Sequence, residues 1–489
     1  MVIIYDNLWM TDRRYIMEKG TDILNERQKI ISALTSARME KGISQQALAD
    51  AVGTQKSNIC RIESGGQNIS LDMLLKITNA LGLDVNMILE ERKTEPDYPI
   101  TEYSLRLYDE ELMTFTLAEE GLAGLQAKIT SLNETRKDVF PLDLKLTGEG
   151  IVKWLSSRVI PKNRAFVDEI LKSLGLSLND TKGIIDVCKG LSLNDSYWVV
   201  PKDFEGTFRD YNLYENRFSA ALSLVAYTGV GQSQEAFTTS PELTTQGMLR
   251  KGWRFIENDG IYLYKGGTEG AANTGKQPYS EYYASQIAET MGLHAVHYDL
   301  EHWKGILASK CRLFTDIDTA YIPVGSIVKS GGIKACLDFY ETLGEDAAEE
   351  LKSMLVFDSL IYNEDRHFGN FGLLRDNRSG KIIGPAPIFD NGLSLFNFAM
   401  AGDIANLSEY AKTRANPYGI SYESICRDVM GSKQRTQLRR MIGFRFQRHP
   451  SINLPEERLQ AIEKQLDQRT RELLSLPRVR TKSEKEPER

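Results

Sequence analysis

The stretch Asn363-Glu-Asp-Arg-His-Phe-Gly-Asn-Phe-Gly372, followed by Pro387-Ile-Phe-Asp-Asn-Gly392, decides how the fold of this chain is interpreted. Within it, Asp365 precedes Asn370, and Asp390 comes after a short hairpin-like stretch. Phosphoryl transfer needs a group that positions a hydroxyl and hard oxygen ligands that hold Mg²⁺. The stretch therefore predicts a phosphoryl-transfer site in which Asp365 orients the acceptor hydroxyl and takes its proton, while Asn370 and Asp390 hold the metal.

The two blocks in this order resemble the HipA-like serine/threonine kinases, which carry Asn-x-Asp-x-His-x-x-Asn and a later Phe-Asp. The core Asp365-Arg-His-x-x-Asn370 is also similar to phosphatidylinositol kinases. The HipA-like resemblance extends over about residues 100 to 475. It implies a multi-domain chain whose larger part is an α+β two-lobed kinase-like domain with a mainly helical C-lobe. It also implies ATP and Mg²⁺ as cofactors and a protein substrate whose identity is unknown.

Two residues in these blocks also have a purely structural explanation. Asp390-Asn-Gly392 read alone is a tight turn, because Asn and Gly tolerate positive φ. Its place after Asp365 and Asn370 favours the metal site. His367 fits a structural hydrogen bonder as well as a functional one, and we assign it no proton-transfer role.

Composition sets outer limits on the function. A chain of 489 residues has room for two to four domains, and 41% apolar with 26% charged residues is typical of a soluble globular protein. No apolar run is long enough for a membrane span or a signal core, so we expect a cytoplasmic protein without a membrane partner. The five cysteines are scattered, which predicts neither a zinc site nor a disulfide framework.

Residues 24–90 carry the pattern of a separate helical domain. Apolar residues recur at helical spacing, and the pattern predicts five short helices, the last beginning at Asp84. The expected amino-terminal caps are Ser44, Thr54 and Ser70, and the expected stops are Gly42, Gly53 and Gly82. The stretch Ser44-Gln-Gln-Ala-Leu-Ala-Asp-Ala-Val-Gly-Thr-Gln-Lys-Ser-Asn-Ile-Cys-Arg-Ile-Glu-Ser-Gly65 closely resembles the XRE-type, Cro-like helix-turn-helix domains.

The second helix of that pair would read DNA. Ile59 and Ile62 are expected in the core. Residues 44–63 would contact the operator, with amides pairing with adenine and cations with guanine or phosphate. The predicted DNA-binding residues are Gln45, Gln55, Lys56, Ser57, Asn58 and Arg61. Such domains read paired half-sites, which implies a homodimer. Because residues 24–89 carry only one more basic than acidic side chain, and the chain has a net charge of −7, a domain used only for protein contact is the alternative.

The remaining domain boundaries are inferred from changes in composition along the chain. We expect an N-terminal extension over 1–23, a linker over 91–103, a HipA-like N-terminal subdomain over 104–235 and a disordered tail over 476–489. The subdomain should open with a hairpin around Asp109 and continue mainly helical from 120 to 200, with Arg158, Lys162 and Arg164 on a solvated face.

The small kinase lobe and hinge are expected over residues 236–345 and the C-lobe with the catalytic and metal motifs over 346–475. Lys265 lies on a predicted strand and shares a face with apolar residues, so it would enter the cleft and bind nucleotide phosphates. Glu281 lies on the helix that follows and could pair with Lys265, as the kinase Lys–Glu bridge requires. Alternatively, Glu281 only complements the helix dipole.

The segment 240–251 occupies the place of a phosphate-covering loop although it lacks a Gly-x-Gly-x-x-Gly pattern. Its candidate nucleotide contacts are Thr245, Gln246 and Gly247, and Phe314 lies where an adenine-binding hinge would fall. HipA-like kinases silence themselves by phosphorylating a serine in this loop, and here the hydroxyls on offer are Ser240, Thr244 and Thr245. The basic stretch Lys433–Arg448 would either dock an acidic partner or form a helix with a charged outer face.

These patterns together predict a HipA-like protein kinase fused to a DNA-binding domain that regulates its own promoter, as in toxin–antitoxin systems. A separate antitoxin subunit could also take part. The alternative is a transcription regulator whose kinase-like domain binds a nucleotide or a partner without transferring phosphate. A lipid kinase is a third reading, which the fused DNA-binding domain disfavours.

Overall fold

The computed structural model describes residues 30–83, 101–120, 124–230, 239–270 and 273–477. These form two compact units, one containing the helices of residues 30–83 and the other the chain from residue 101 onward apart from residues 120–124. The predicted extension 1–23, the helix from Asp84, most of the linker 91–103 and most of the tail 476–489 lie outside the described residues. The finer division of residues 104–475 stays a prediction.

The first unit is all helical. Its helices cover residues 30–40, α2 (Gln45–Val52), α3 (Lys56–Glu63) and α4 (Leu71–Ala80). Ser44 and Ser70 cap α2 and α4 as predicted, because each side chain accepts a hydrogen bond from the amide three residues later. Gly53 ends α2 with φ of 71°, a conformation that suits glycine.

One predicted cap in this unit is wrong. Gln55, not Thr54, is the N-cap of α3, and its side chain makes no capping bond. The Thr54 hydroxyl instead accepts a hydrogen bond from the side-chain amide of Asn58 at 2.9 Å. Ile59 and Ile62 are buried as predicted, in a core shared by all the described helices of this unit.

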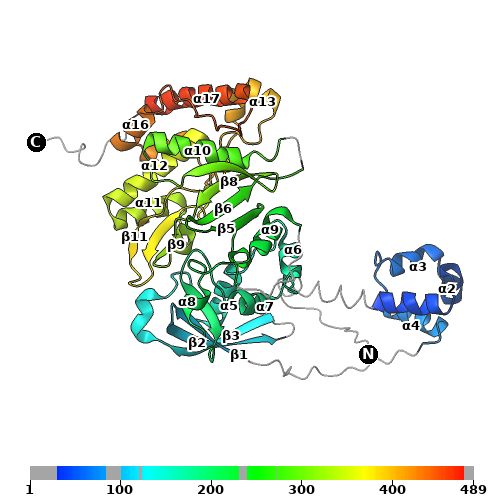
Figure 1. Ribbon diagram of the computed structural model, residues 1–489. Coiled ribbons are helices and arrows are strands. Elements are labelled where there is room, and N and C mark those ends of the chain that lie inside the picture. The colour runs from blue at the N-terminus through cyan, green and yellow to red at the C-terminus, as the bar shows by residue number, and fades with distance from the viewer. Residues whose placement is uncertain (1–29, 84–100, 121–123, 231–238, 271–272, 478–489) are drawn as a thin grey trace, which may run out of the picture. The chain divides into compact units, whose positions relative to one another are not determined.

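The second unit begins with an antiparallel sheet of order β3-β2-β1-β4. Its strands are β1 (Thr101–Leu107), β2 (Glu110–Glu120), β3 (Gly124–Leu132) and β4 (Tyr197–Pro201). Around it lie η2 (Glu134–Val139), α5 (Gly148–Ser157), α6 (Val167–Lys172), α7 (Thr181–Cys188), α8 (Phe208–Tyr211) and α9 (Ala220–Thr228). Figure 1 shows β1, β2 and β3 in cyan at one end of this unit.

The hairpin around Asp109 is confirmed, but the mainly helical prediction for residues 120–200 is wrong in part. Residues 124–132 form β3, and residues 197–201 form β4, which pairs with β1. The sequence of β3 does alternate, because Leu125, Ala127 and Ile129 are half-buried against the core while the residues between them are exposed. The helical prediction overlooked this period of two.

A second antiparallel sheet, of order β5-β6-β8-β7, follows the short helix η3 (Pro241–Leu243). Its strands are β5 (Lys251–Ile256), β6 (Gly260–Gly266), β7 (Tyr298–Trp303) and β8 (Ile306–Arg312). Helix α10 (Gln277–Met291) packs against β6, β7 and β8. It begins three residues earlier than the predicted Ser280 and ends at Gly292 as predicted.

The carboxyl-terminal part is helical around a small sheet of order β11-β10-β9. The elements are β9 (Thr319–Pro323), η4 (Val324–Ser326), α11 (Gly332–Leu343), α12 (Glu345–Ile361), β10 (Gly372–Asp376), β11 (Ile382–Pro385), α13 (Ala401–Ala405), α14 (Leu407–Ala411), α15 (Tyr422–Val429), α16 (Ser432–Arg439) and α17 (Glu456–Ser475). The apolar faces of α10, α11, α12, α15, α16 and α17 share one core. No helix in the described ranges is long and apolar enough to cross a bilayer.

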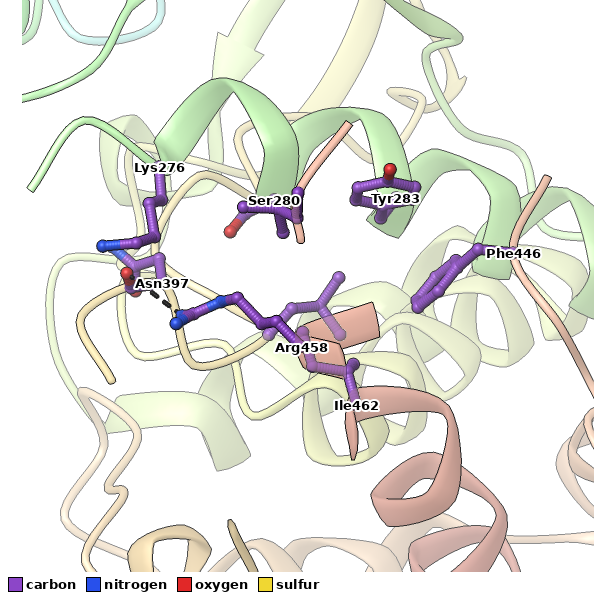
Figure 2. Close-up of a pocket in the computed structure, with 9 residues that line it drawn as sticks. Lys276, Ser280, Tyr283, Asn397, Phe446, Arg458 and Ile462 are labelled. Carbon is purple, nitrogen blue, oxygen red and sulfur yellow. Dashed lines mark hydrogen bonds between the residues drawn. The ribbon is translucent and has the colours of Figure 1, made fainter. Parts of the chain in front are cut away.

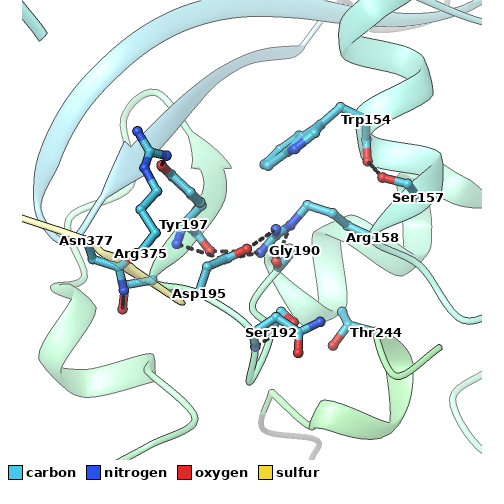
Figure 3. A network of polar contacts seen from close by, with 12 residues as sticks. Trp154, Ser157, Arg158, Gly190, Ser192, Asp195, Tyr197, Thr244, Arg375 and Asn377 are labelled. Atoms are coloured by element: carbon cyan, nitrogen blue, oxygen red, sulfur yellow. Dashed lines mark hydrogen bonds and ion pairs between the residues drawn. The ribbon is translucent and has the colours of Figure 1, made fainter. Parts of the chain in front are cut away.

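Two arginines expected on a solvated face are buried. Arg158 binds both carboxylate oxygens of Asp195 at 2.8 Å and the carbonyl of Gly190, as Figure 3 shows. Arg164 and Glu242 form an ion pair in which both side chains are fully buried. Lys162 alone of the three is exposed. The charges of Arg158 and Arg164 are paired with acids 37 and 78 residues away, which no local pattern reveals.

Candidate active site

Helix α12 presents the loop that carries Asp365. Nearly all of its second half is buried, and the helix ends at Tyr362, whose φ of 54° turns the chain sharply. The Asn363 side chain then accepts a hydrogen bond from the Asp365 amide and donates one to Asp358 of α12. This local bonding fixes the backbone of the loop around Asp365.

Arg366 joins this loop to the segment that contains Asp390. Its guanidinium group is 1% exposed and is paired with Asp358 at 3.0 Å. It also donates to the backbone carbonyls of Asn370 and Phe389, and to the Asn391 side chain at 2.5 Å. One buried cation therefore holds residue 370 beside residues 389–391. No sequence pattern predicts a role for Arg366, because its partners are recognisable only in the folded chain.

Asp365 and Asn370 present oxygen atoms that the protein itself does not use. The Asn370 side chain donates its amide hydrogen to the Asp365 carbonyl at 3.0 Å. Among the described residues, nothing donates a hydrogen bond to the Asp365 carboxylate or to the Asn370 side-chain oxygen. Burial, then the nearby Asp390 charge, raises the pKa of Asp365.

Lys265 enters the site from the opposite wall. Its ammonium group lies 3.0 Å from Glu281 Oε1 and also pairs with Asp390 Oδ1. Glu281 is fully buried, and its second oxygen accepts a hydrogen bond from the Asn391 amide at 2.7 Å. The predicted Lys265–Glu281 ion pair is therefore present. Glu281 also fixes the segment that carries Asp390. A residue that only complemented the helix dipole would not make this bond.

The charges of this triad are strongly coupled. Burial raises the pKa of Asp390, but the Lys265 ammonium outweighs it and holds the pKa at about 2. For Lys265, burial favours the neutral form, but the Asp390 and Glu281 carboxylates reverse this and the net shift of its pKa is upward. The site therefore holds an ammonium and a carboxylate in contact.

Lys251 is a further cation at the site that the sequence analysis did not single out. It lies directly opposite Lys265 in the β5–β6 pairing, and its ammonium donates to the Gln246 carbonyl at 2.7 Å. Burial, then repulsion from Lys265 and Arg164, lowers its pKa to about 7. The pairing register could have revealed the pair, because Lys251 opens β5, Lys265 lies near the end of β6, and the two strands are joined by a short turn.

The predicted phosphate loop is held by residues at the end of α5 and in the segment that follows it. Arg164 donates to the Glu242 carbonyl at 2.7 Å and to the Lys251 carbonyl at 3.0 Å, which fixes both ends of the loop. The Gln246 side chain donates to carbonyls at the end of α5 rather than facing the cleft. Gly247 has φ of 91° and lies against the Lys251 ammonium group.

The three hydroxyls proposed for self-modification are turned inward. Ser240 and Thr244 are buried, with Ser240 capping η3 and Thr244 bonded to the Pro241 carbonyl. The Thr245 hydroxyl donates to that same carbonyl at 2.6 Å and accepts from the Trp253 indole at 2.8 Å. Phosphorylation of any of them requires the loop to leave this position.

Phe314 lies close to the segment that carries Asp390. Its ring packs against Phe389, with centroids 5.4 Å apart, and against Tyr321 at 5.7 Å. Leu263 of β6 belongs to the same small apolar cluster. This cluster forms an apolar surface next to the Lys265–Asp390 pair, as a planar base would need.

The oxygen inventory fits Mg²⁺. The Asp365 carboxylate, the side-chain oxygen of Asn370 and the second oxygen of Asp390 are hard ligands that accept no hydrogen bond from any described residue. The described chain contains no group of three His, Cys, Asp or Glu side chains arranged around a metal. Two carboxylates and one amide match a metal bound partly by substrate phosphates, rather than one enclosed by the protein.

The predicted DNA-binding residues differ in their exposure. Gln55, Lys56, Ser57 and Arg61 are exposed, and Asn58 is half-buried and bonded to Thr54. Gln45 differs because its amide donates to Glu63 at 2.8 Å, where Glu63 also binds Arg38. Gln45 is therefore part of the packing between α2 and α3.

Comparison with known proteins supports this part of the chain directly. Residues 34–88 match a helix-turn-helix family model, HTH_3. Residues 34–88 form a helix-turn-helix domain. This helix-turn-helix domain is followed by a mixed α/β unit, as the sequence predicts. A comparison of the whole sequence with curated proteins finds none that matches.

Two solved structures are similar to parts of the chain. One is a chain from the complex of the Shewanella oneidensis MR-1 toxin–antitoxin proteins HipA and HipB with operator DNA, with 14% identity, a TM-score of 0.47, and coverage of 76% of this chain and 98% of that one. The other is the Helicobacter pylori proinflammatory kinase CtkA, with 21% identity, a TM-score of 0.39, and coverage of 48% and 93%. At these low identities and TM-scores, neither likeness assigns a function to the second unit.

Proposed function

We propose that the second unit is an ATP- and Mg²⁺-dependent protein serine/threonine kinase of the HipA-like type. The observation that carries the proposal is the contact of Lys265 with both Glu281 and Asp390, across from the unpartnered oxygens of Asp365 and Asn370. These five side chains come from a strand, a helix and two loops. Arg366 and Glu281 hold them together through buried hydrogen bonds.

Each group then has one task in phosphoryl transfer. Lys265 and Lys251 are placed to bind nucleotide phosphates, and Glu281 orients Lys265. Asp365 accepts a hydrogen bond from the acceptor hydroxyl and takes its proton, a role favoured by its raised pKa. Asn370 and Asp390 would hold Mg²⁺, which when bound neutralises charge on the transferring phosphoryl group.

The decisive experiment is phosphoryl transfer by the purified full chain from labelled ATP to general protein acceptors. Asp365→Asn should reduce the rate by about 10²- to 10⁴-fold, because it removes the base while keeping the shape. Asp338→Asn, an exposed acid on α11, is the control and should retain the wild-type rate. Equal transfer by Asp365→Asn would contradict the assignment. No transfer by wild type would leave the alternative, a transcription regulator with a non-catalytic kinase-like unit.

We further propose that the helix-turn-helix domain binds operator DNA as part of a homodimer and regulates transcription, as a toxin–antitoxin regulator would. A separate antitoxin chain and a cellular protein substrate belong to this proposal. The exposed polar face of Gln55, Lys56, Ser57 and Arg61 supports it. In this proposal Arg61 reads guanine or phosphate, and Gln55 reads adenine.

Salt dependence tests the DNA contact. If each bound protein makes about six phosphate contacts, affinity for operator DNA should fall by about 10³-fold between 50 and 200 mM salt. Replacing Lys56 by Gln should lower the salt dependence of the affinity by the equivalent of about one phosphate contact. Lys329→Gln in the second unit should leave the salt dependence unchanged. Affinity that is insensitive to salt would point to the protein-contact alternative.

A further inference from the structure

A small hollow lies away from the candidate active site, at the start of α10. It is bounded by α10, by the segment after Asp390, by the chain before α17 and by α17 itself. In Figure 2 the polar ends of Lys276, Asn397 and Arg458 converge at one end of the hollow, and the rings of Tyr283 and Phe446 lie towards the other. The hollow thus has a polar end and an apolar end.

Arg458 is a buried cation without a carboxylate partner. It is 8% exposed, and it donates to the backbone carbonyls of Phe396, Asn397 and Ala399. Its Nε–H group is buried and has no partner in the described chain. Asp403 acts on it electrostatically but is bonded to the Met400 amide at 2.8 Å. A buried charge left in this state is costly unless something else neutralises it.

Two more donors face the same space. The Nδ2 group of Asn397, a residue that is 5% exposed, is buried without a partner. The Lys276 ammonium is half-buried and forms no hydrogen bond or ion pair with any described residue. Burial, then repulsion from Arg458, lowers the pKa of Lys276. Every unsatisfied group around the polar end is therefore a donor, and two of the three are cations.

The start of α10 adds a fourth element of the same sign. This helix of 15 residues begins after Lys276, and no side chain caps it. The partial positive charge of a helix amino terminus favours an anion. We propose that Arg458, Asn397, Lys276 and the start of α10 form a binding site for a small inorganic anion.

The size of the hollow selects the class of anion. The free space is about 10 Å³, near the lower limit for one water-sized occupant. A phosphate group or a nucleotide does not fit without rearrangement, whereas a monatomic halide needs only a small displacement of the side chains. A water molecule would satisfy the donors but would not balance the two cations. Chloride is therefore the expected ligand.

The anion would hold together three parts of the second unit. Asn397 follows Asp390 by seven residues, Lys276 precedes Glu281 by five, and Arg458 belongs to α17. Ser280, which also borders the hollow, already donates to the Ser394 carbonyl at 3.0 Å. Bound chloride would fix the first turn of α10 against segment 391–397. Binding itself does not depend on the kinase assignment.

Crystallography with bromide gives a direct test on the full chain. Crystals exchanged into bromide should show an anomalous scattering peak in contact with Arg458 Nε and Asn397 Nδ2. The expected result is a peak that is absent from crystals kept in gluconate. A well-ordered hollow without anomalous signal in bromide would overturn the proposal.

The solution test compares potassium chloride with potassium gluconate at constant ionic strength. Chloride at ten times its dissociation constant should raise the folding equilibrium constant of the second unit about 11-fold, seen as an upward shift in melting temperature. It should also slow hydrogen exchange in the first turn of α10 and in segment 391–397. Equal melting temperatures and exchange rates in the two salts would refute the site.

Asn397→Asp places a carboxylate beside Arg458 and Lys276 in a side chain of the same shape. This variant should lose the chloride response, because the site then contains its own anion. Asn258→Asp, in an exposed turn, makes the same charge change elsewhere and should keep the full response. A normal chloride response in Asn397→Asp would contradict the assignment. If that variant does not fold, Lys276→Gln should shift the chloride midpoint several-fold higher, and an unchanged midpoint would equally contradict it.

Discussion

The helix-turn-helix domain and the candidate active site are built in opposite ways. In the first, α2 and α4 each carry their own serine cap and their own apolar stripe. In the second, Lys265 meets Asp390 across 125 residues of sequence, and Arg366 meets Asn391 across 25. Information for one region is local, and for the other it is distributed along the chain.

This difference teaches where each region is vulnerable. In the helix-turn-helix domain, one substitution removes one local bond and leaves the neighbouring helices intact. In the candidate active site, one substitution leaves a buried charge without its partner, and no neighbouring residue replaces that partner. Buried ion pairs are sensitive to removal of one member, even where the pair as a whole adds little net stability. Three substitutions test this contrast.

Arg366→Met should have the largest effect. It leaves Asp358 buried without its cation, and we expect the second unit to lose about 3–5 kcal/mol of unfolding free energy. Denaturant unfolding followed by tryptophan fluorescence measures this, since the tryptophans of the described residues all lie in the second unit. Arg471→Met removes a largely exposed partner of Asp467 and should cost at most about 1 kcal/mol. Similar losses of unfolding free energy in the two variants would contradict the expected difference between the candidate active site and an exposed ion pair.

Lys251 gives a pH dependence that is specific to the active site. Its pKa is about 7 in the folded chain against an ordinary value of 10.5, so between these pH values the unfolded chain binds more protons. Stability of the second unit should therefore rise with pH in this window, by up to about 1.4 kcal/mol per pH unit for a whole proton. Lys251→Met removes the titrating group and should flatten the slope. Unfolding curves collected across the window compare the two proteins, and parallel pH profiles would contradict the shift.

Ser44→Ala should have the smallest of the three effects and should remain local. It removes the cap of α2 and should cost the helix-turn-helix domain about 1 kcal/mol. Native-state hydrogen exchange of the α2 amides measures the loss in the full chain. Ser57→Ala, on the exposed face of α3, should leave exchange unchanged while altering DNA binding. A loss of phosphoryl transfer in Ser44→Ala would show that the two regions are not independent.

Several features were predictable because their signal is local. The caps Ser44 and Ser70, the stop at Gly53, the core positions Ile59 and Ile62 and the hairpin around Asp109 all follow from residue type and short spacing. The Lys265–Glu281 pair was also predicted, because each residue lies on a regular element whose buried face is readable. The failures have equally physical causes. The apolar residues of β3 are only half-buried and belong to one short strand inside a mainly helical pattern, and the charges of Arg158 and Arg164 face acids from distant segments.

By itself, the sequence determined the helix-turn-helix domain and the types of residue available for phosphoryl transfer, because helical spacing, caps and motif order are properties of neighbouring residues. Only the tertiary structure decided that Arg366 fastens the two loops, that Lys251 faces Lys265, and that Arg458 is buried without an acid. These outcomes depend on which segments meet when the core forms. Burial then sets the energy of each charge according to the partner it finds, and that partner lies far away in the sequence.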